Sequence, residues 1–134
     1  MNDNRIALSE YRLDEAARCI RAAKISVDND DYKTAVNRSY YVFFHCIRSV
    51  LALDGINFKK HSAVIGHFRK EYIKTGIFDT KYSDYIGVAF DIRGDSDYED
   101  FYIISKQEVN SQILHASEFF DCVKGFLSER IKSK

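Results

Sequence analysis

The chain contains no proline and six glycines among its 134 residues. Because these two residues are the strongest helix breakers, their scarcity favours long, uninterrupted helices. No apolar run approaches the roughly 18 residues of a membrane span, so a membrane is not an expected partner. A chain of this length can bury a sizeable core, and we expect one domain over residues 1–134.

The chain also lacks an excess of either charge, with 20 Lys and Arg against 20 Asp and Glu. A general polyanion binder usually has a marked basic excess, so that class is disfavoured, although a local basic pocket stays open. The three cysteines fall within apolar helical patterns, which indicates buried free thiols in a reducing cytoplasm. The polar N-terminus does not resemble a signal peptide, so a cytoplasmic location is expected.

Five apolar stretches follow helical spacing and predict helices. Their approximate bounds are residues 9–27, 31–53, 62–74, 81–93 and 105–131. Ser9 and Ser105 are expected N-caps, the latter in a capping box with Glu108, while Gly55 and Gly94 are expected to end helices. The predicted fold is an all-α, antiparallel up-and-down bundle of about five helices.

One polar cluster follows the fourth predicted helix, in the segment Arg93-Gly-Asp-Ser-Asp-Tyr98. Arg93 can bind a phosphate through two parallel hydrogen bonds, with Asp97 and Tyr98 beside it. The alternative is a helix end, where the helix dipole favours Arg93, followed by a solvated, acidic and aromatic loop over residues 94–104.

A second polar cluster lies on the second predicted helix, where Arg38, Tyr41 and His45 share one face. Burying such groups without partners costs roughly 1–3 kcal/mol each. They form either an internal hydrogen-bond network with acidic residues of the fourth helix, or a basic pocket that Arg38 shares with Arg93.

The histidines do not predict a metal site. His61 and His67 are six residues apart, which differs from the i, i+4 spacing of a helical zinc pair. His61 is interpreted as an N-terminal residue of the third helix. The chain has no glycine-rich phosphate loop either, and we expect no cofactor.

Three segments carry a resemblance to a known family: residues 35–45 (AVNRSYYVFFH), 61–76 (HSAVIGHFRKEYIKTG) and 93–98 (RGDSDY). In their order and spacing the chain resembles the small stand-alone prokaryotic members of the HEPN superfamily, over roughly residues 10–130. The resemblance implies an up-and-down helical bundle that usually forms a homodimer. It also implies a gene neighbour, a minimal nucleotidyltransferase, in a toxin–antitoxin pair.

In HEPN ribonucleases, an arginine and a histidine with four to six residues between them form the site, with both protomers contributing. Arg93 matches the arginine, but Tyr98 stands at the shortest histidine spacing, and Glu99 and Asp100 stand at the longer ones. In some pairs the transferase adds AMP to a tyrosine two residues after the histidine. Asp100 occupies that position, so the modified tyrosine has no match.

The replaced histidine affects the expected chemistry. Metal-independent RNA cleavage needs a base for the 2′-hydroxyl and an acid for the leaving oxygen. A phenol with a pKa around 10 is deprotonated in about one molecule in a thousand at pH 7, a handicap of roughly 4 kcal/mol as a base. Tyr98 could serve as the acid and His45 as the base, but nuclease activity is expected to be weak or absent.

The leading hypothesis is a dimeric partner of a minimal nucleotidyltransferase that binds nucleotide or RNA in a groove around Arg93. The groove would be lined by Arg38, Tyr41, His45, Arg93, Asp97 and Tyr98. One alternative is a metal-independent endoribonuclease that uses Arg93 and Tyr98. The other is a non-catalytic helical interaction module. A homodimer is also expected because the fifth helix and residues 98–104 carry more apolar residues than a small bundle can bury.

Overall fold

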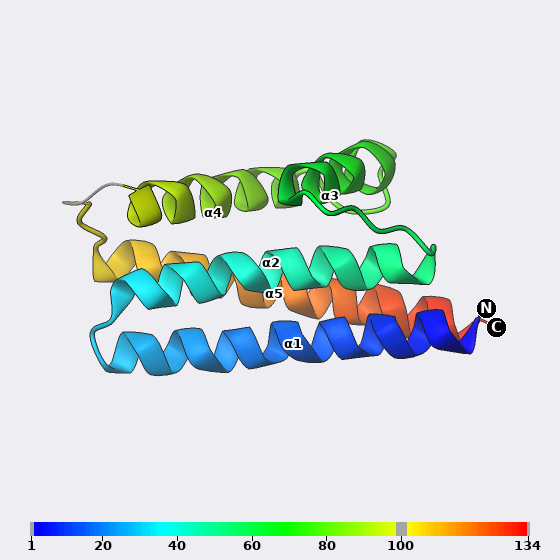
Figure 1. Ribbon diagram of the computed structural model, residues 1–134, viewed down its shortest axis with the longest axis horizontal. Coiled ribbons are helices and arrows are strands. Elements are labelled where there is room, and N and C mark those ends of the chain that lie inside the picture. Colours follow the sequence, from blue (N-terminus) through cyan, green and yellow to red (C-terminus); the bar gives the residue numbers. More distant parts are fainter. Residues whose placement is uncertain (1, 99–101, 134) are drawn as a thin grey trace.

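The computed structural model describes residues 2–98 and 102–133, which fold into helices joined by short turns. The helices are α1 (Asp3–Asp28), α2 (Tyr32–Leu53), α3 (His61–Phe68), the π-helix η1 (Arg69–Ile73), α4 (Lys81–Tyr98) and α5 (Lys106–Lys132). α1, α2, α4 and α5 alternate in direction, and α3 lies beside α4 at one end of the bundle (Figure 1). The predicted all-α, antiparallel bundle is confirmed.

α2 is the central helix, and it packs against α1, α3, α4 and α5. Its wide apolar face is buried along its whole length, as the sequence predicts. Phe43 on α2 stacks on Phe119 of α5, and Phe68 and Tyr82 also contact the Phe119 ring. Because a buried aromatic side chain contributes about 1.5–3 kcal/mol, this cluster anchors α3, α4 and α5 to α2.

The predicted start of the first helix is wrong. α1 begins at Asp3, and the Asn2 side chain caps it by accepting the Asn4 backbone N–H at 2.7 Å. Ser9 lies buried inside the helix, and its hydroxyl donates to the Ser49 carbonyl of α2 at 2.7 Å. The first turn of α1 is exposed and polar, so its residues carry no apolar periodicity that would reveal it.

The predicted end of the fourth helix at Arg93 is also wrong, because α4 continues to Tyr98. Gly55 and Gly76 have the positive φ angles, 69° and 87°, that end a helix, whereas Gly94 stays helical. The expected loop over residues 94–104 is therefore helical in its first part. Positions 99–101, including the histidine spacings at Glu99 and Asp100, lie outside the described residues.

The remaining helix predictions are confirmed, with one refinement. The predicted helix over residues 62–74 is α3 followed by η1, where the Lys74 N–H donates to the Arg69 carbonyl at 2.8 Å. α5 opens with the capping box of Ser105 and Glu108. No described helix combines the length and the apolar character needed to cross a membrane.

Candidate functional site around Arg93

Arg93 projects from α4 onto two aromatic rings of α2. Its guanidinium carbon lies 4.7 Å from the centroid of the Tyr40 ring and 5.4 Å from that of Tyr41. Its Nε atom lies 3.4 Å from Oδ2 of Asp97, one helical turn further along α4. The side chains of Arg93 and Asp97 are 26% and 28% exposed. Arg93 is thus a half-buried cation fixed by packing.

Tyr40 connects Arg93 to a histidine that the sequence did not place at the site. The Tyr40 residue is 1% exposed, and its hydroxyl lies 3.0 Å from Nδ1 of His61, the first residue of α3. The His61 ring also stacks on Phe44, with 3.9 Å between centroids. The turn after α2 therefore returns the chain so that His61 meets the ring on which Arg93 rests.

The environment keeps both groups uncharged at neutral pH. Burial lowers the pKa of His61, and the cations Arg93 and Arg48 lower it further. Burial raises the pKa of Tyr40, which the charge and hydrogen bonding of Arg93 partly oppose. The result is a neutral imidazole, able to accept a proton, hydrogen-bonded to a neutral phenol next to a fixed cation.

The predicted face of α2 forms part of the same cluster. The Arg38 guanidinium lies 5.4 Å from the Tyr41 ring centroid, so Arg38 and Arg93 share one aromatic ring. Arg38 also donates to the side-chain oxygen of its neighbour Asn37 at 2.6 Å. The two arginines that the basic-pocket prediction joins thus meet at one aromatic ring.

His45 lies beside Tyr41, with 5.8 Å between the centroids of the two rings. Burial lowers the pKa of His45; Glu15 on α1 raises it, whereas Arg48, Arg38 and Arg12 lower it. The charges of three arginines and one glutamate thus act on this histidine.

Tyr98 is placed differently from the other predicted site residues. It is 87% exposed and stands five residues after Arg93 within the same helix. At about 100° per residue, its side chain leaves α4 roughly 140° away from that of Arg93. Asp95 is likewise exposed on α4. The helix therefore groups Asp97, and not Tyr98, with Arg93.

Tyr40 and His61 are the site residues that sequence reasoning missed. Tyr40 follows the apolar pattern of α2, which predicts a core position, and its ring is indeed buried. His61 lies 21 residues further along the chain, and no spacing rule connects the two positions. Within the described part of the chain, no group of three or more His, Cys, Asp or Glu side chains could hold a metal ion.

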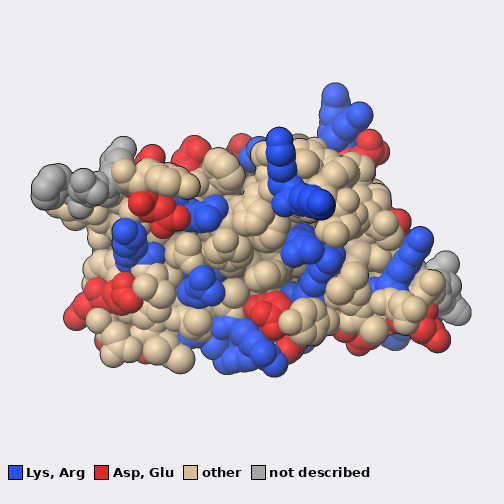
Figure 2. Space-filling model, in the orientation of Figure 1, with Lys and Arg blue, Asp and Glu red and all other residues tan. Residues whose placement is uncertain are grey.

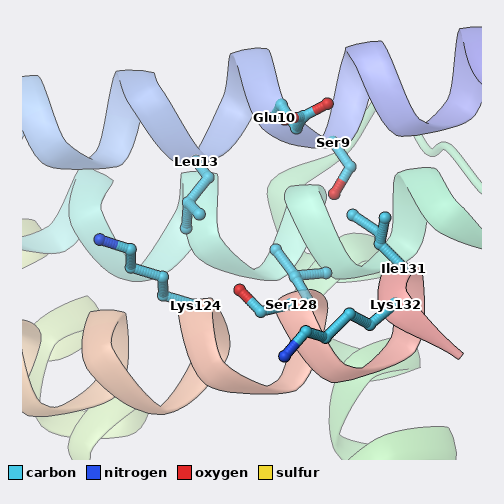
Figure 3. Close-up of a pocket in the computed structure, with 8 residues that line it drawn as sticks. Ser9, Glu10, Leu13, Lys124, Ser128, Ile131 and Lys132 are labelled. Atoms are coloured by element: carbon cyan, nitrogen blue, oxygen red, sulfur yellow. The ribbon is translucent and has the colours of Figure 1, made fainter.

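Hollows elsewhere on the surface lie apart from Arg93. A groove of about 460 Å³ runs between α1 and α5, with Leu13 and Ile131 on its walls and Lys124 and Lys132 at its rim (Figure 3). A second hollow, of about 390 Å³, lies between α3 and α4 and includes Phe90. Neither groove is lined by Arg93 or Arg38.

The comparison with known families gives the family of the chain. The HEPN domain family matches residues 9–126, which is most of the chain. The chain belongs to the HEPN domain family. This HEPN chain is 34% identical over 111 residues to a protein from Methanocaldococcus jannaschii named "Putative toxin MJ0142", covering 83% of this chain and 75% of the relative.

Two further relatives are similar over comparable lengths. "Putative toxin MJ0605", also from Methanocaldococcus jannaschii, is 33% identical over 110 residues, covering 82% of this chain and 81% of the relative. A UPF0332 protein from Thermotoga maritima is 29% identical over 120 residues, covering 90% of this chain and 91% of the relative. The similarity therefore extends over nearly the whole HEPN fold.

Proposed function

We propose that this HEPN protein is the dimeric partner of a minimal nucleotidyltransferase in a toxin–antitoxin-type module, and that it binds nucleotide or RNA at Arg93. The observation that carries the proposal is the Arg93 guanidinium, held over Tyr40 and Tyr41 with Arg38 on the same tyrosine. A stacked guanidinium is pre-organised and weakly hydrated, which suits it to a phosphate.

The position of Asp97 is compatible with such a ligand. Its carboxylate approaches Nε, on the stem side of the guanidinium, and not the terminal nitrogens. The two terminal nitrogens can give a phosphate two parallel hydrogen bonds. The toxin names of two relatives support a toxin–antitoxin context for the protein.

Exposed apolar side chains support both the proposed homodimer and the proposed binding to a nucleotidyltransferase. Ile103 and Leu114 are largely exposed, on the segment before α5 and on α5 itself. Large apolar side chains gathered on a surface mark protein interfaces. We expect a dimer in light scattering at micromolar concentration, and a monomer at that concentration would contradict the proposal.

Co-expression with the neighbouring gene product tests the partner, and calorimetry with 5′-AMP tests the ligand. Wild type is expected to co-purify with the nucleotidyltransferase and to bind 5′-AMP. Arg93→Ala is expected to lose the 5′-AMP binding, whereas Arg21→Ala, at an exposed position of α1, keeps it. A protein that forms no complex and binds no nucleotide would refute the proposal.

A metal-independent endoribonuclease is the second candidate, and the contact between Tyr40 and His61 favours it. In this reaction His61 accepts the proton of a ribose 2′-hydroxyl, and the 2′-oxygen bonds to phosphorus. The bond from phosphorus to the 5′-oxygen breaks, and that oxygen takes a proton from water. Arg93 stabilises the charge that develops on the phosphate.

RNA cleavage in the presence of EDTA tests this second candidate. His61→Asn and Arg93→Ala are expected to lose cleavage, while Tyr98→Phe keeps it because Tyr98 lies on another face of α4. Cleavage that persists in His61→Asn would exclude His61 as the base. If the wild type leaves RNA intact, the binding function stands without the reaction.

A further inference from the structure

A small pocket of about 230 Å³ lies where the start of α1 meets the end of α2. The polar residues that line it are Arg5, Arg12, Asn2, Asn4 and Asn57. No carboxylate contributes to this lining. Two arginines and three asparagines thus line a space large enough for a phosphate group.

Arg12 is the unusual member of this pocket because it is 9% exposed and is not paired with a carboxylate among the described residues. It donates from Nη1 to the Arg48 carbonyl at 3.1 Å. Burial lowers the pKa of Arg12, and the nearby charge of Arg48 lowers it further. A buried cation without a counter-charge is unfavourable, so an anion in the pocket would stabilise it.

Arg5 is held in place by the backbone of the turn after α2. Its guanidinium lies against Gly55, where an added Cβ would meet Nη2 at 2.5 Å. Asp54 is the acidic residue that senses the charge of Arg5, but its carboxylate is already hydrogen-bonded by Arg130 and Tyr72. Asp54 is shared with Arg130, so it offsets the positive charge of the pocket only in part.

A continuous series of contacts joins this pocket to Arg93. Arg48 donates to the Asn57 side chain at 3.4 Å, and its guanidinium lies 5.7 Å from the Phe44 ring centroid. Phe44 stacks on His61, which contacts Tyr40 beneath Arg93. Figure 2 shows basic side chains over α1 and α2 in the middle of the face seen there, with an acidic patch among them.

We propose that the pocket of Arg5 and Arg12 is a second phosphate subsite, and that the ligand of this protein is a single-stranded RNA that runs along α2 from Arg93 to this pocket. The inference rests on the proposed binding of nucleotide or RNA at Arg93. Tyr41 at one end and Ala52 at the pocket are eleven residues apart on α2. At 1.5 Å per residue they are separated by roughly 17 Å, which a mononucleotide cannot span.

The groups between the two subsites suit the bases of such a strand. Tyr41, His45 and His61 are partly exposed rings, and Arg48 adds a cation beside them. Proteins that bind single strands combine a basic track for the backbone with aromatic rings on which bases stack. The strip thus has the chemistry of a single-strand groove, although the whole chain carries no net charge.

Two ligands distinguish the contributions of the two subsites. 5′-AMP reaches Arg93 alone, whereas an oligouridine of about ten nucleotides reaches both subsites. We expect oligouridine binding at low salt to weaken by about tenfold or more in Arg5→Ala and in the double variant that combines Arg5→Ala with Arg48→Ala. The slope of log affinity against log salt should fall by about 0.7 for each phosphate that the variant no longer neutralises. Both variants, and the control Arg21→Ala, should bind 5′-AMP like the wild type.

Three other outcomes would overturn the inference, and each has a different meaning. Oligouridine binding that is unchanged in the Arg5 and Arg48 variants, while Arg93→Ala still abolishes 5′-AMP binding, removes the second subsite and leaves the proposed function intact. If the wild type binds neither ligand, both proposals fail. If the variants change self-association in light scattering and leave RNA binding unchanged, the strip is a dimer interface instead.

Discussion

At the scale of single residues, the arrangement of Arg93 is determined by what lies beneath it. Tyr40 is part of the core, so the ring that supports the guanidinium cannot move aside without disturbing α2. A cation over an aromatic ring contributes about 0.5–2 kcal/mol, depending on how far it is desolvated. Arg93→Lys would keep the charge and lose the planar, stacked fork.

The titration of His61 reports this arrangement directly. Burial is the largest cause of its lowered pKa, and the charge of Arg93 comes next. Because a nearby cation disfavours the imidazolium, removing it in Arg93→Ala should raise the His61 pKa toward its ordinary value. NMR titration of the imidazole resonances measures this, with Arg21→Ala as the control. An unchanged His61 pKa in Arg93→Ala would mean that the two side chains are not neighbours in solution.

The sequence predicted part of this site and missed part for identifiable reasons. Arg93, Arg38 and Tyr41 were recognisable because charged and phenolic groups on an apolar helix need partners. Tyr40 was not recognisable, because a tyrosine on an apolar helix face fits the core pattern even when its hydroxyl has a polar partner. His61 depends on the path of the turn after α2, which no local pattern specifies.

At the scale of helices, the extension of α4 past Gly94 decides which groups meet. The ion pair of Arg93 with Asp97 exists because both residues are helical and four positions apart. Had the helix ended at Arg93, as the glycine suggested, Asp97 would not be held one turn below it. Gly55 and Ser105 gave correct boundaries because their local geometry, a positive φ and a capping box, is specific.

Two glycine substitutions test the course of α4. An added Cβ meets no atom within 4 Å at either Gly94 or Gly76, but Gly76 has a φ of 87° and Gly94 is helical. Gly94→Ala should therefore raise the free energy of unfolding by about 0.5–1 kcal/mol, because alanine favours a helix. Gly76→Ala should lower it by about 1 kcal/mol, because the left-handed conformation strains alanine. Urea denaturation measures both, and a destabilised Gly94→Ala would indicate that the helix ends there.

At the scale of the whole molecule, Asp54 joins three elements. Its carboxylate, at the C-terminal end of α2, accepts hydrogen bonds from Tyr72 of η1 and Arg130 of α5. Burial raises the pKa of Asp54, but the hydrogen bonds from Arg130 and Tyr72, with the charges of Arg130 and Arg5, outweigh it and hold the pKa below its usual range.

The pH dependence of stability follows from that lowered pKa. A carboxyl group whose pKa is lower in the folded state stabilises the protein above its unfolded pKa of about 3.9, and the stabilisation is lost as the pH falls through the folded value. Asp54→Asn should lower the free energy of unfolding by about 1–2 kcal/mol at pH 7, with a difference from wild type that shrinks below about pH 4.

Urea denaturation across pH measures the effect, and Asp14→Asn is the matched control. Asp14 pairs with Arg18 on the exposed face of α1, so its removal should change the free energy of unfolding by less than about 0.5 kcal/mol. Equal effects of the two substitutions at pH 7 would show that Asp54 does not join α2 to η1 and α5.

The role of Arg93 in binding is decided by the affinity of wild type and of Arg93→Ala for a short single-stranded RNA, followed by fluorescence anisotropy. Thermal melting of both proteins shows that the fold is kept. We expect wild type to bind the RNA, and we expect Arg93→Ala to lose most of this affinity while Arg21→Ala does not. Equal RNA affinities of wild type and a folded Arg93→Ala, with a lowered melting temperature as the sole change, would make Arg93 a structural residue and refute its role as a ligand-binding group.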